Sequence, residues 1–151
     1  MRKISLFTCA LTAGALIFGA VTFAPAVHAA EDQLKIRKEG FEATKKSFGA
    51  IKKLLEDGGD LSAAAAPAQS INAFAKQVPA LFPAGSDKGE TKAKAAIWSN
   101  GADFGVKAQA FEAESAKLIQ AVASGDKAAV QKQFGAVGGT CKGCHDTYRS
   151  E

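Results

Sequence analysis

The stretch 138–149 reads Gly-Gly-Thr-Cys-Lys-Gly-Cys-His-Asp-Thr-Tyr-Arg, and it closes an apolar pattern that runs through 126–149 at helical spacing. Within it, Cys141, Cys144 and His145 form a Cys-x-x-Cys-His motif. This spacing is typical of c-type haem attachment, in which two thiols bond the porphyrin vinyl groups and the imidazole ligates iron. Both thiols occupy the apolar stripe of the expected helix, so we expect the porphyrin to point into the interior of a helical fold.

Other chemistry is open to the same three side chains. In an exported protein the two cysteines could form a disulfide. A zinc site needs about four protein ligands, whereas the motif offers three. A thioredoxin-like redox pair expects a βαβ setting, and strand signals are nearly absent from this chain. The histidine that follows the second cysteine favours haem c and its iron over these alternatives.

Residues 1–30 have the pattern of an export signal. Two basic residues precede an uncharged apolar run over 6–21, and small residues then lead to expected cleavage after Ala29 or Ala30. An apolar run of this length could instead stay in the membrane as an anchor, but the small residues that follow it favour cleavage of the segment. We interpret Cys9 as part of the discarded segment. The pattern predicts a periplasmic protein.

Removal of the signal leaves 31–151 as one domain. Of the 19 Lys and Arg residues, two lie in the signal, so 17 remain against 15 acids. A net charge of about +2 is too small to indicate a nucleic acid or an anionic membrane surface as a partner.

Four segments carry an apolar stripe at helical spacing, at about 31–57, 67–81, 92–123 and 126–149. Alanine, lysine and glutamate dominate the chain and favour helix. Four amphipathic helices with short connections predict an all-α fold, a left-handed antiparallel bundle with up-down-up-down connectivity. Bundle cores commonly host cofactors, and the sevenfold spacing of large apolar residues favours shallow crossing angles.

Two pairs of glycines stand out in the expected helices. Gly101 and Gly105 weaken the third helix by up to about 1 kcal/mol each relative to alanine. We expect their small size to permit close approach by another helix or by the cofactor. Gly138 and Gly139 precede the haem motif, where they either make room for the haem or mark a local kink.

Over its mature length the chain resembles cytochrome c′, a class II c-type cytochrome. Four features carry the resemblance: Glu-Asp-x-x-Lys-x-Arg at 31–37, Phe48-Gly49, Ile97-Trp98-Ser99, and Cys-Lys-Gly-Cys-His-Asp-Thr-Tyr-Arg at 141–149. The last is specific in position and sequence, and the others support it. The resemblance implies a periplasmic, usually homodimeric bundle with one covalent haem c and five-coordinate, high-spin iron.

The mature chain lacks the usual second axial ligands of an electron-transfer haem, which are Met or a second His. The only methionine is Met1, and the only histidine besides His145 is His28 in the signal. Low-spin relatives in the resembled class place a methionine on the first helix, and this chain has none there. A lysine would first have to be buried and lose its proton. We therefore expect a vacant sixth position on the iron.

The resemblance places Phe41 over the open face of the haem, and the apolar stripe of the first helix also turns this residue inward. It further implies that Arg37 binds a haem propionate and that Thr91, at the start of the third helix, contacts a propionate. Arg149 follows His145 by four residues, so it shares its helical face and could act on the proximal side. The alternatives are core packing for Phe41, a solvated side chain for Arg37 and a frayed terminal arginine for Arg149.

An apolar cap excludes charged or bulky molecules and admits a small uncharged diatomic, so we expect binding of nitric oxide or carbon monoxide. The alternative function is a one-electron carrier that serves an unknown redox partner. Because His145 is committed to iron, no distal histidine remains for acid–base chemistry, and we do not expect an enzyme.

Overall fold

The computed structural model describes residues 24–151, and side chains from 32 onward. Most of the expected signal peptide lies outside the described residues, so the signal and its cleavage site stay predictions. None of the helices within the described residues is long and apolar enough to cross a bilayer.

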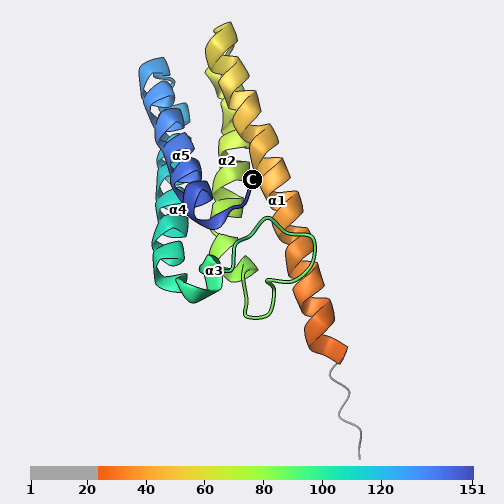
Figure 1. Cartoon of the computed structure of the whole chain (residues 1–151). Helices are drawn as coiled ribbons and strands as arrows, with labels where there is room; N and C mark the ends of the chain where they lie inside the picture. Colours follow the sequence, from red (N-terminus) through yellow and green to blue (C-terminus); the bar gives the residue numbers. More distant parts are fainter. Residues whose placement is uncertain (1–23) are drawn as a thin grey trace, which may run out of the picture.

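Four helices form an antiparallel bundle: α1 (Ala24–Asp57), α2 (Ala65–Ala75), α4 (Gly101–Ser124) and α5 (Lys127–Tyr148). In Figure 1, α1 and α4 run upward while α2 and α5 run downward, so successive helices alternate in direction. The predicted all-α, up-down-up-down bundle is confirmed. Among the described residues, the one β-type pairing is an isolated bridge between Ala93 and Arg149.

The second helix is shorter than the predicted span 67–81. A 3-10 turn, η1 (Leu61–Ala64), precedes α2, and a second one, η2 (Val78–Leu81), follows it. Pro79 lies in η2 and has no backbone N–H to continue an α-helical ladder, while its ring crowds the preceding turn. The apolar stripe continues past Ala75, but the α-helix ends there.

The prediction of one continuous third helix over 92–123 is wrong. A single turn, α3 (Ala96–Ser99), comes first, and Asn100 then leaves the helical region with φ −126° and ψ 49°. The break falls beside Gly101, where helix propensity is low. A Cβ added at Gly101 or Gly105 would meet no atom within 4 Å, so no other helix approaches these glycines closely.

The fourth helix agrees with its predicted span of 126–149. Asp126 caps its start, where a side-chain oxygen accepts from the N–H groups of Ala128 and Ala129. Gly125 ends α4 in the left-handed conformation with φ 68°, which glycine adopts without steric cost. Helix α5 runs unbroken through Gly138 and Gly139 to Tyr148.

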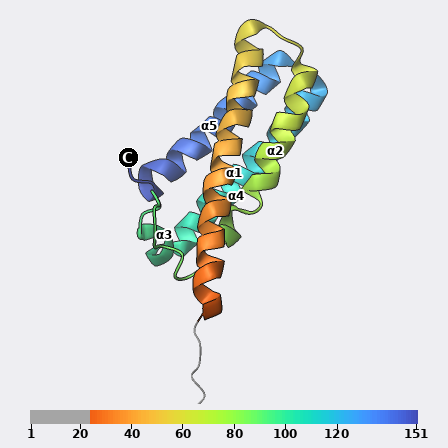
Figure 2. The ribbon, with the colours of Figure 1, turned by 90° about the vertical axis from the view of Figure 1, so that its right-hand side faces the viewer.

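All four long helices contribute to the core: α1 packs on α2, α2 on α4 and α4 on α5, while α1 meets α5 at few positions. The fully buried large aliphatic side chains of the core are worth about 1.5–3 kcal/mol each; they are Ile51, Ile71, Leu118, Val130 and Val137. Figure 2 shows α5 crossing α1 and α2 at an angle. Helix α5 therefore packs on α4 along its length and leaves room on its α1 side.

Candidate haem site

A pocket of about 880 Å³ lies between α1 and α5, and the segment 90–93 closes one side of it. This volume is within the range of ligand-binding pockets, about 300–1,000 Å³. Its lining includes every site residue that the sequence predicts, from three separate parts of the chain: Arg37, Phe41, Thr91, Cys141, Cys144, His145 and Arg149. The structure therefore brings the whole predicted set together at one place.

The two thiols face this pocket from α5. Both are partly buried and neither forms a disulfide. Burial raises the pKa of the Cys141 and Cys144 thiols. The pKa of His145 is lowered, first by burial and then by the positive charge of Arg149. A neutral imidazole is the form that ligates iron, so the chemistry of these three side chains fits covalent haem.

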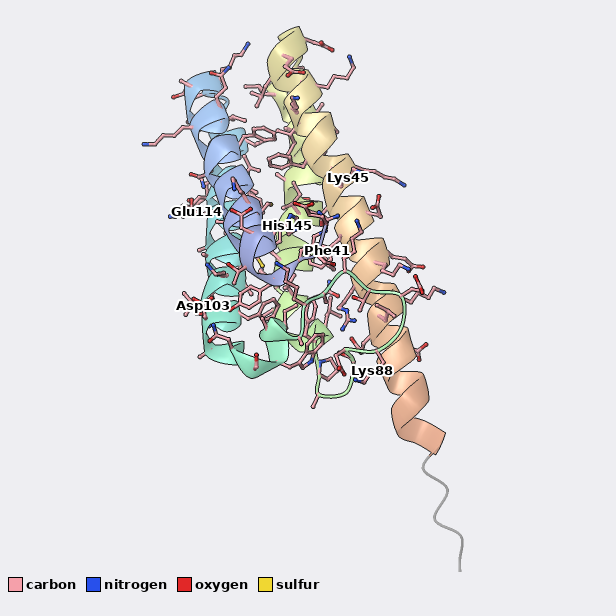
Figure 3. All side chains as sticks on the ribbon, viewed as in Figure 1. Phe41, Lys45, Lys88, Asp103, Glu114 and His145 are labelled. Atoms are coloured by element: carbon pink, nitrogen blue, oxygen red, sulfur yellow. The ribbon has the colours of Figure 1, made fainter. Side chains whose placement is uncertain are left out.

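Phe41 stands on the α1 wall of the pocket. Its ring meets Phe74 edge to face, with centroids 4.9 Å apart, and 37% of the residue stays exposed on the pocket side. Figure 3 shows Phe41 and His145 in the space between α1 and α5. Phe41 thus packs against the core with one edge and lines the pocket, which places it opposite the helix that carries His145.

Gly40 makes this packing possible. A Cβ at this position would lie 1.9 Å from Cε2 of Phe74, so any larger residue would displace the ring. The contact between Gly40 and Phe74 was not predicted from the sequence. A glycine inside a helical pattern was the available signal, since such a residue often marks a close contact.

Arg37 is buried, with 3% of its surface exposed, and the solvated alternative is wrong. Its guanidinium donates to the carbonyl of Leu81 at 3.0 Å and to both Oγ and the carbonyl oxygen of Ser86 at 2.8 Å. It also lies over the ring of Phe82, 4.6 Å from the centroid. These contacts fasten the loop after η2 to α1.

No carboxylate among the described residues forms an ion pair with Arg37, although the residue lines the pocket. A buried cation is costly unless a charge or hydrogen bonds compensate it. Three of its five N–H donors are used by the loop. The arginine therefore fits an anionic group in the pocket, such as a haem propionate.

Thr91 does not open a helix, contrary to the prediction. It lies in an extended segment ahead of α3, where its Oγ1 accepts from the N–H of Ala93 at 3.1 Å. It still reaches the pocket edge.

Arg149 has an exposed side chain, but its N–H donates to the carbonyl of His145 at 3.0 Å. Its backbone is therefore held, and the alternative of a frayed terminal arginine is wrong.

Aromatic rings close the end of the pocket near Phe48, which stacks on Phe134 with centroids 3.9 Å apart. Gly138 lines the same region, and a Cβ there would lie 3.4 Å from Cζ of Phe48. Gly138 therefore lies on the pocket surface, as expected if it makes room for the haem. Helical hydrogen bonding continues through it, which gives no support to a kink.

Two polar residues near the pocket, Thr44 and Tyr148, were not predicted as site residues from the sequence. Thr44 follows Phe41 by three residues and lines the pocket, and its buried Oγ1 has no hydrogen-bond partner among the described residues. Tyr148 is buried and donates from its hydroxyl to Asp103 at 2.6 Å. Helical spacing from Phe41 could have indicated Thr44, whereas the partner of Tyr148 lies 45 residues away and had no local signal.

A Cys-x-x-Cys-His motif that faces a ligand-sized, aromatic-lined pocket inside a helical bundle defines the class of haem c proteins. Among the described residues, no group of three or more His, Cys, Asp and Glu side chains is placed to hold a bare metal ion. A model of the family described as Cytochrome C' matches residues 32–149. The chain belongs to the cytochrome c′ family, whose cofactor is covalent haem c with its iron.

Relatives agree with this assignment along most of the chain. Cytochrome c′ from Pararhodospirillum photometricum is 39% identical over 123 residues, which cover 79% of this chain and 97% of that protein. A cytochrome c′ with ligand-controlled dimer dissociation has a similar structure, with TM-score 0.78, 33% identity, and coverage of 81% of this chain and 97% of the other. The nitric oxide complex of a variant of cytochrome c prime from Alcaligenes xylosoxidans matches with TM-score 0.74, 31% identity, and coverage of 81% and 96%.

Proposed function

We propose that this chain is a periplasmic haem c protein whose five-coordinate, high-spin iron binds nitric oxide and carbon monoxide. The pocket wall on α1 carries the proposal, because it presents Phe41 opposite the helix of His145. From residue 32 onward the chain contains no methionine and no histidine except His145. The protein therefore offers one strong axial ligand and an apolar ring on the other side.

The residues around the pocket have separate roles in this proposal. Cys141 and Cys144 hold the porphyrin by thioether bonds, and His145 ligates the iron from α5. Haem iron supplies the site at which a diatomic gas coordinates. Arg37 binds a propionate, as its unpaired buried charge supports, and Thr91 lies near enough to the pocket edge to add a second propionate contact.

Phe41 controls which molecules reach the open face of the iron. Its ring is partly exposed on the pocket side, so it can swing aside without opening the core. An apolar gate of this kind excludes ions and larger polar molecules and passes an uncharged diatomic. Arg149 shares a helical face with His145 and acts from the proximal side, where its charge already lowers the pKa of that imidazole.

The relatives support gas binding and a homodimer. A variant of the similar protein from Alcaligenes xylosoxidans forms a nitric oxide complex, and another similar cytochrome c′ has a dimer whose dissociation a ligand controls. Sedimentation of the holoprotein with and without carbon monoxide tests the dimer. N-terminal sequencing of the exported protein tests the cleavage expected after Ala29 or Ala30.

Electron transfer is the second candidate. Because the pocket lies between α1 and α5, which meet at few positions, a haem bound there would have an edge accessible to an unknown redox partner. A vacant sixth position favours gas binding over electron transfer, because such iron changes its coordination when its oxidation state changes, and this change slows electron transfer.

We propose that the gas is bound and not converted, because the pocket offers no second histidine for acid–base chemistry.

The absorption spectrum of the reduced holoprotein tests the proposed function. We expect a broad high-spin spectrum that changes on addition of nitric oxide and of carbon monoxide. A sharp low-spin spectrum, unchanged by either gas, would contradict the vacant site and would favour the electron carrier.

A further inference from the structure

His145 lies in the last turn of α5, which ends at Tyr148. The last carbonyls of a helix lack intrahelical partners, and terminal turns open readily unless other parts of the fold hold them. An axial ligand on such a turn would move with it. The contacts that hold this turn therefore bear directly on where the imidazole stands.

The side chain of Tyr148 joins this turn to α4. Its hydroxyl donates to Oδ2 of Asp103 at 2.6 Å, and the ring packs edge to face on Phe104 with centroids 5.4 Å apart. Only 2% of Tyr148 is exposed, and burial together with Asp103 raises its pKa to about 12. The hydroxyl thus keeps its proton and stays a donor over the physiological pH range. Figure 3 shows Asp103 on α4, on the side of the bundle away from α1.

The backbone around Tyr148 is held as well. Its carbonyl accepts from the N–H of Lys94 at 2.9 Å, and the N–H of Ser150 donates to the carbonyl of Lys92 at 2.9 Å. The antiparallel bridge between Ala93 and Arg149 lies between these two bonds. The extended segment 92–94, which replaces the predicted start of the third helix, therefore holds the end of α5 through backbone hydrogen bonds.

We propose that Tyr148, held by Asp103, is a positioning residue for His145. It precludes movement of the last turn of α5 away from α4 and so keeps the imidazole on the iron when a gas ligand binds from the opposite side. Tyr148 follows His145 by three residues, which places the two side chains in adjacent positions on one turn. This inference rests on the proposed function and extends it, because it assigns the strength of proximal ligation to a hydrogen bond between Tyr148, at the pocket wall, and Asp103, which does not line the pocket.

Tyr148→Phe tests the proposal, since it removes the hydroxyl and keeps the ring that packs on Phe104. In the holoprotein we expect hydrogen exchange at the amides of Arg149 and Ser150 to rise about 10- to 100-fold, the effect of losing one hydrogen bond to a charged group. We expect the iron–histidine stretching band of the reduced protein to shift to lower frequency. With nitric oxide, a larger share of the protein should lose His145 from the iron.

Two variants serve as controls. Asp103→Asn keeps an acceptor for the Tyr148 hydroxyl but removes its charge, so all three changes should be smaller than in Tyr148→Phe. Thr147→Val alters an exposed neighbour on the same turn, whose hydroxyl contacts only the carbonyl of Gly143 at 3.4 Å, and it should leave the iron–histidine band in place.

An iron–histidine band and amide exchange that stay unchanged in Tyr148→Phe would overturn the proposal. Lower stability with an unchanged band would also overturn it, because it would show a structural contact without influence on the ligand. If the unaltered protein does not bind nitric oxide, the proposed function fails, while the exchange rates and the stretching band still decide the role of Tyr148.

Discussion

The burial of Arg37 could not be predicted from its neighbours in the sequence. Its place beside an apolar stripe on the first helix allowed either a solvated charge or a buried one. The loop that follows η2 decides the outcome, because Leu81 and Ser86 supply oxygen acceptors and Phe82 supplies a ring. These partners lie 44 to 49 residues away in sequence, so helical spacing could not reveal them.

Phe41→Ala tests the gate at the scale of one residue. Removing the ring should speed carbon monoxide association with the reduced holoprotein by about 10-fold, which corresponds to a barrier lowered by about 1.4 kcal/mol. Flash photolysis or stopped-flow mixing measures the rate.

Ile36→Ala provides the matched control for this variant. Ile36 lies on the same helix with a similar exposure, 40% against 37% for Phe41, and it does not line the pocket. Its truncation should leave the association rate unchanged. Equal rates in Phe41→Ala and the unaltered protein would place some other residue over the iron.

The apolar pattern predicts which residues of each helix are buried, whereas the helix ends are set by capping residues, glycine and proline. The fourth helix matches its prediction because Asp126 and Gly125 give clear local start and stop signals. The second and third predicted spans break at Ala75 and Asn100, although their apolar stripes continue. Periodicity records which side chains are buried, and a stripe can run through two short elements that share one face.

Gly40→Ala tests the packing of α1 on α2. The new methyl group would collide with the buried ring of Phe74, so we expect a loss of about 1–3 kcal/mol in the free energy of unfolding, as in other overpacked cores. Because Phe74 supports Phe41, carbon monoxide kinetics should change as well. Urea unfolding of the holoprotein measures the stability.

Gly49→Ala is the control, since an added Cβ meets no atom within 4 Å at this exposed position of the same helix. It should raise the stability by up to about 1 kcal/mol through helix propensity alone. A destabilisation of the same size in both variants would mean that the Phe74 contact is not the cause.

At the scale of the whole molecule, the haem pocket is a gap between the first and last helices. Helix α5 packs on α4 and α1 packs on α2, and the pocket of about 880 Å³ lies where α1 and α5 meet at few positions. A group that binds only the folded chain stabilises it, and haem in this pocket would contact side chains of both helices. We therefore expect the bound cofactor to contribute to the stability of the bundle.

The double variant Cys141→Ala, Cys144→Ala, prepared without haem, tests this dependence. Relative to the holoprotein, we expect it to lose more than about 3 kcal/mol in the free energy of unfolding, since a ligand that binds only the folded chain contributes about this much at a few hundred times its dissociation constant. Urea unfolding followed by circular dichroism measures the loss. A single Cys141→Ala variant that retains haem through Cys144 should lose much less, and equal stability of all three proteins would show that the helices close the gap unaided.

The sequence by itself determined the cofactor and the helical class. The spacing of Cys141, Cys144 and His145 is a local property, and so is the apolar stripe that carries both thiols inward. Tertiary structure alone decided the surroundings of that motif: the burial of Arg37, the contact between Gly40 and Phe74, and the tie from Tyr148 to Asp103. Periodicity specifies which face of a helix turns inward, but the partner on the facing helix depends on how the helices pack, and that contact joins residues far apart in the chain.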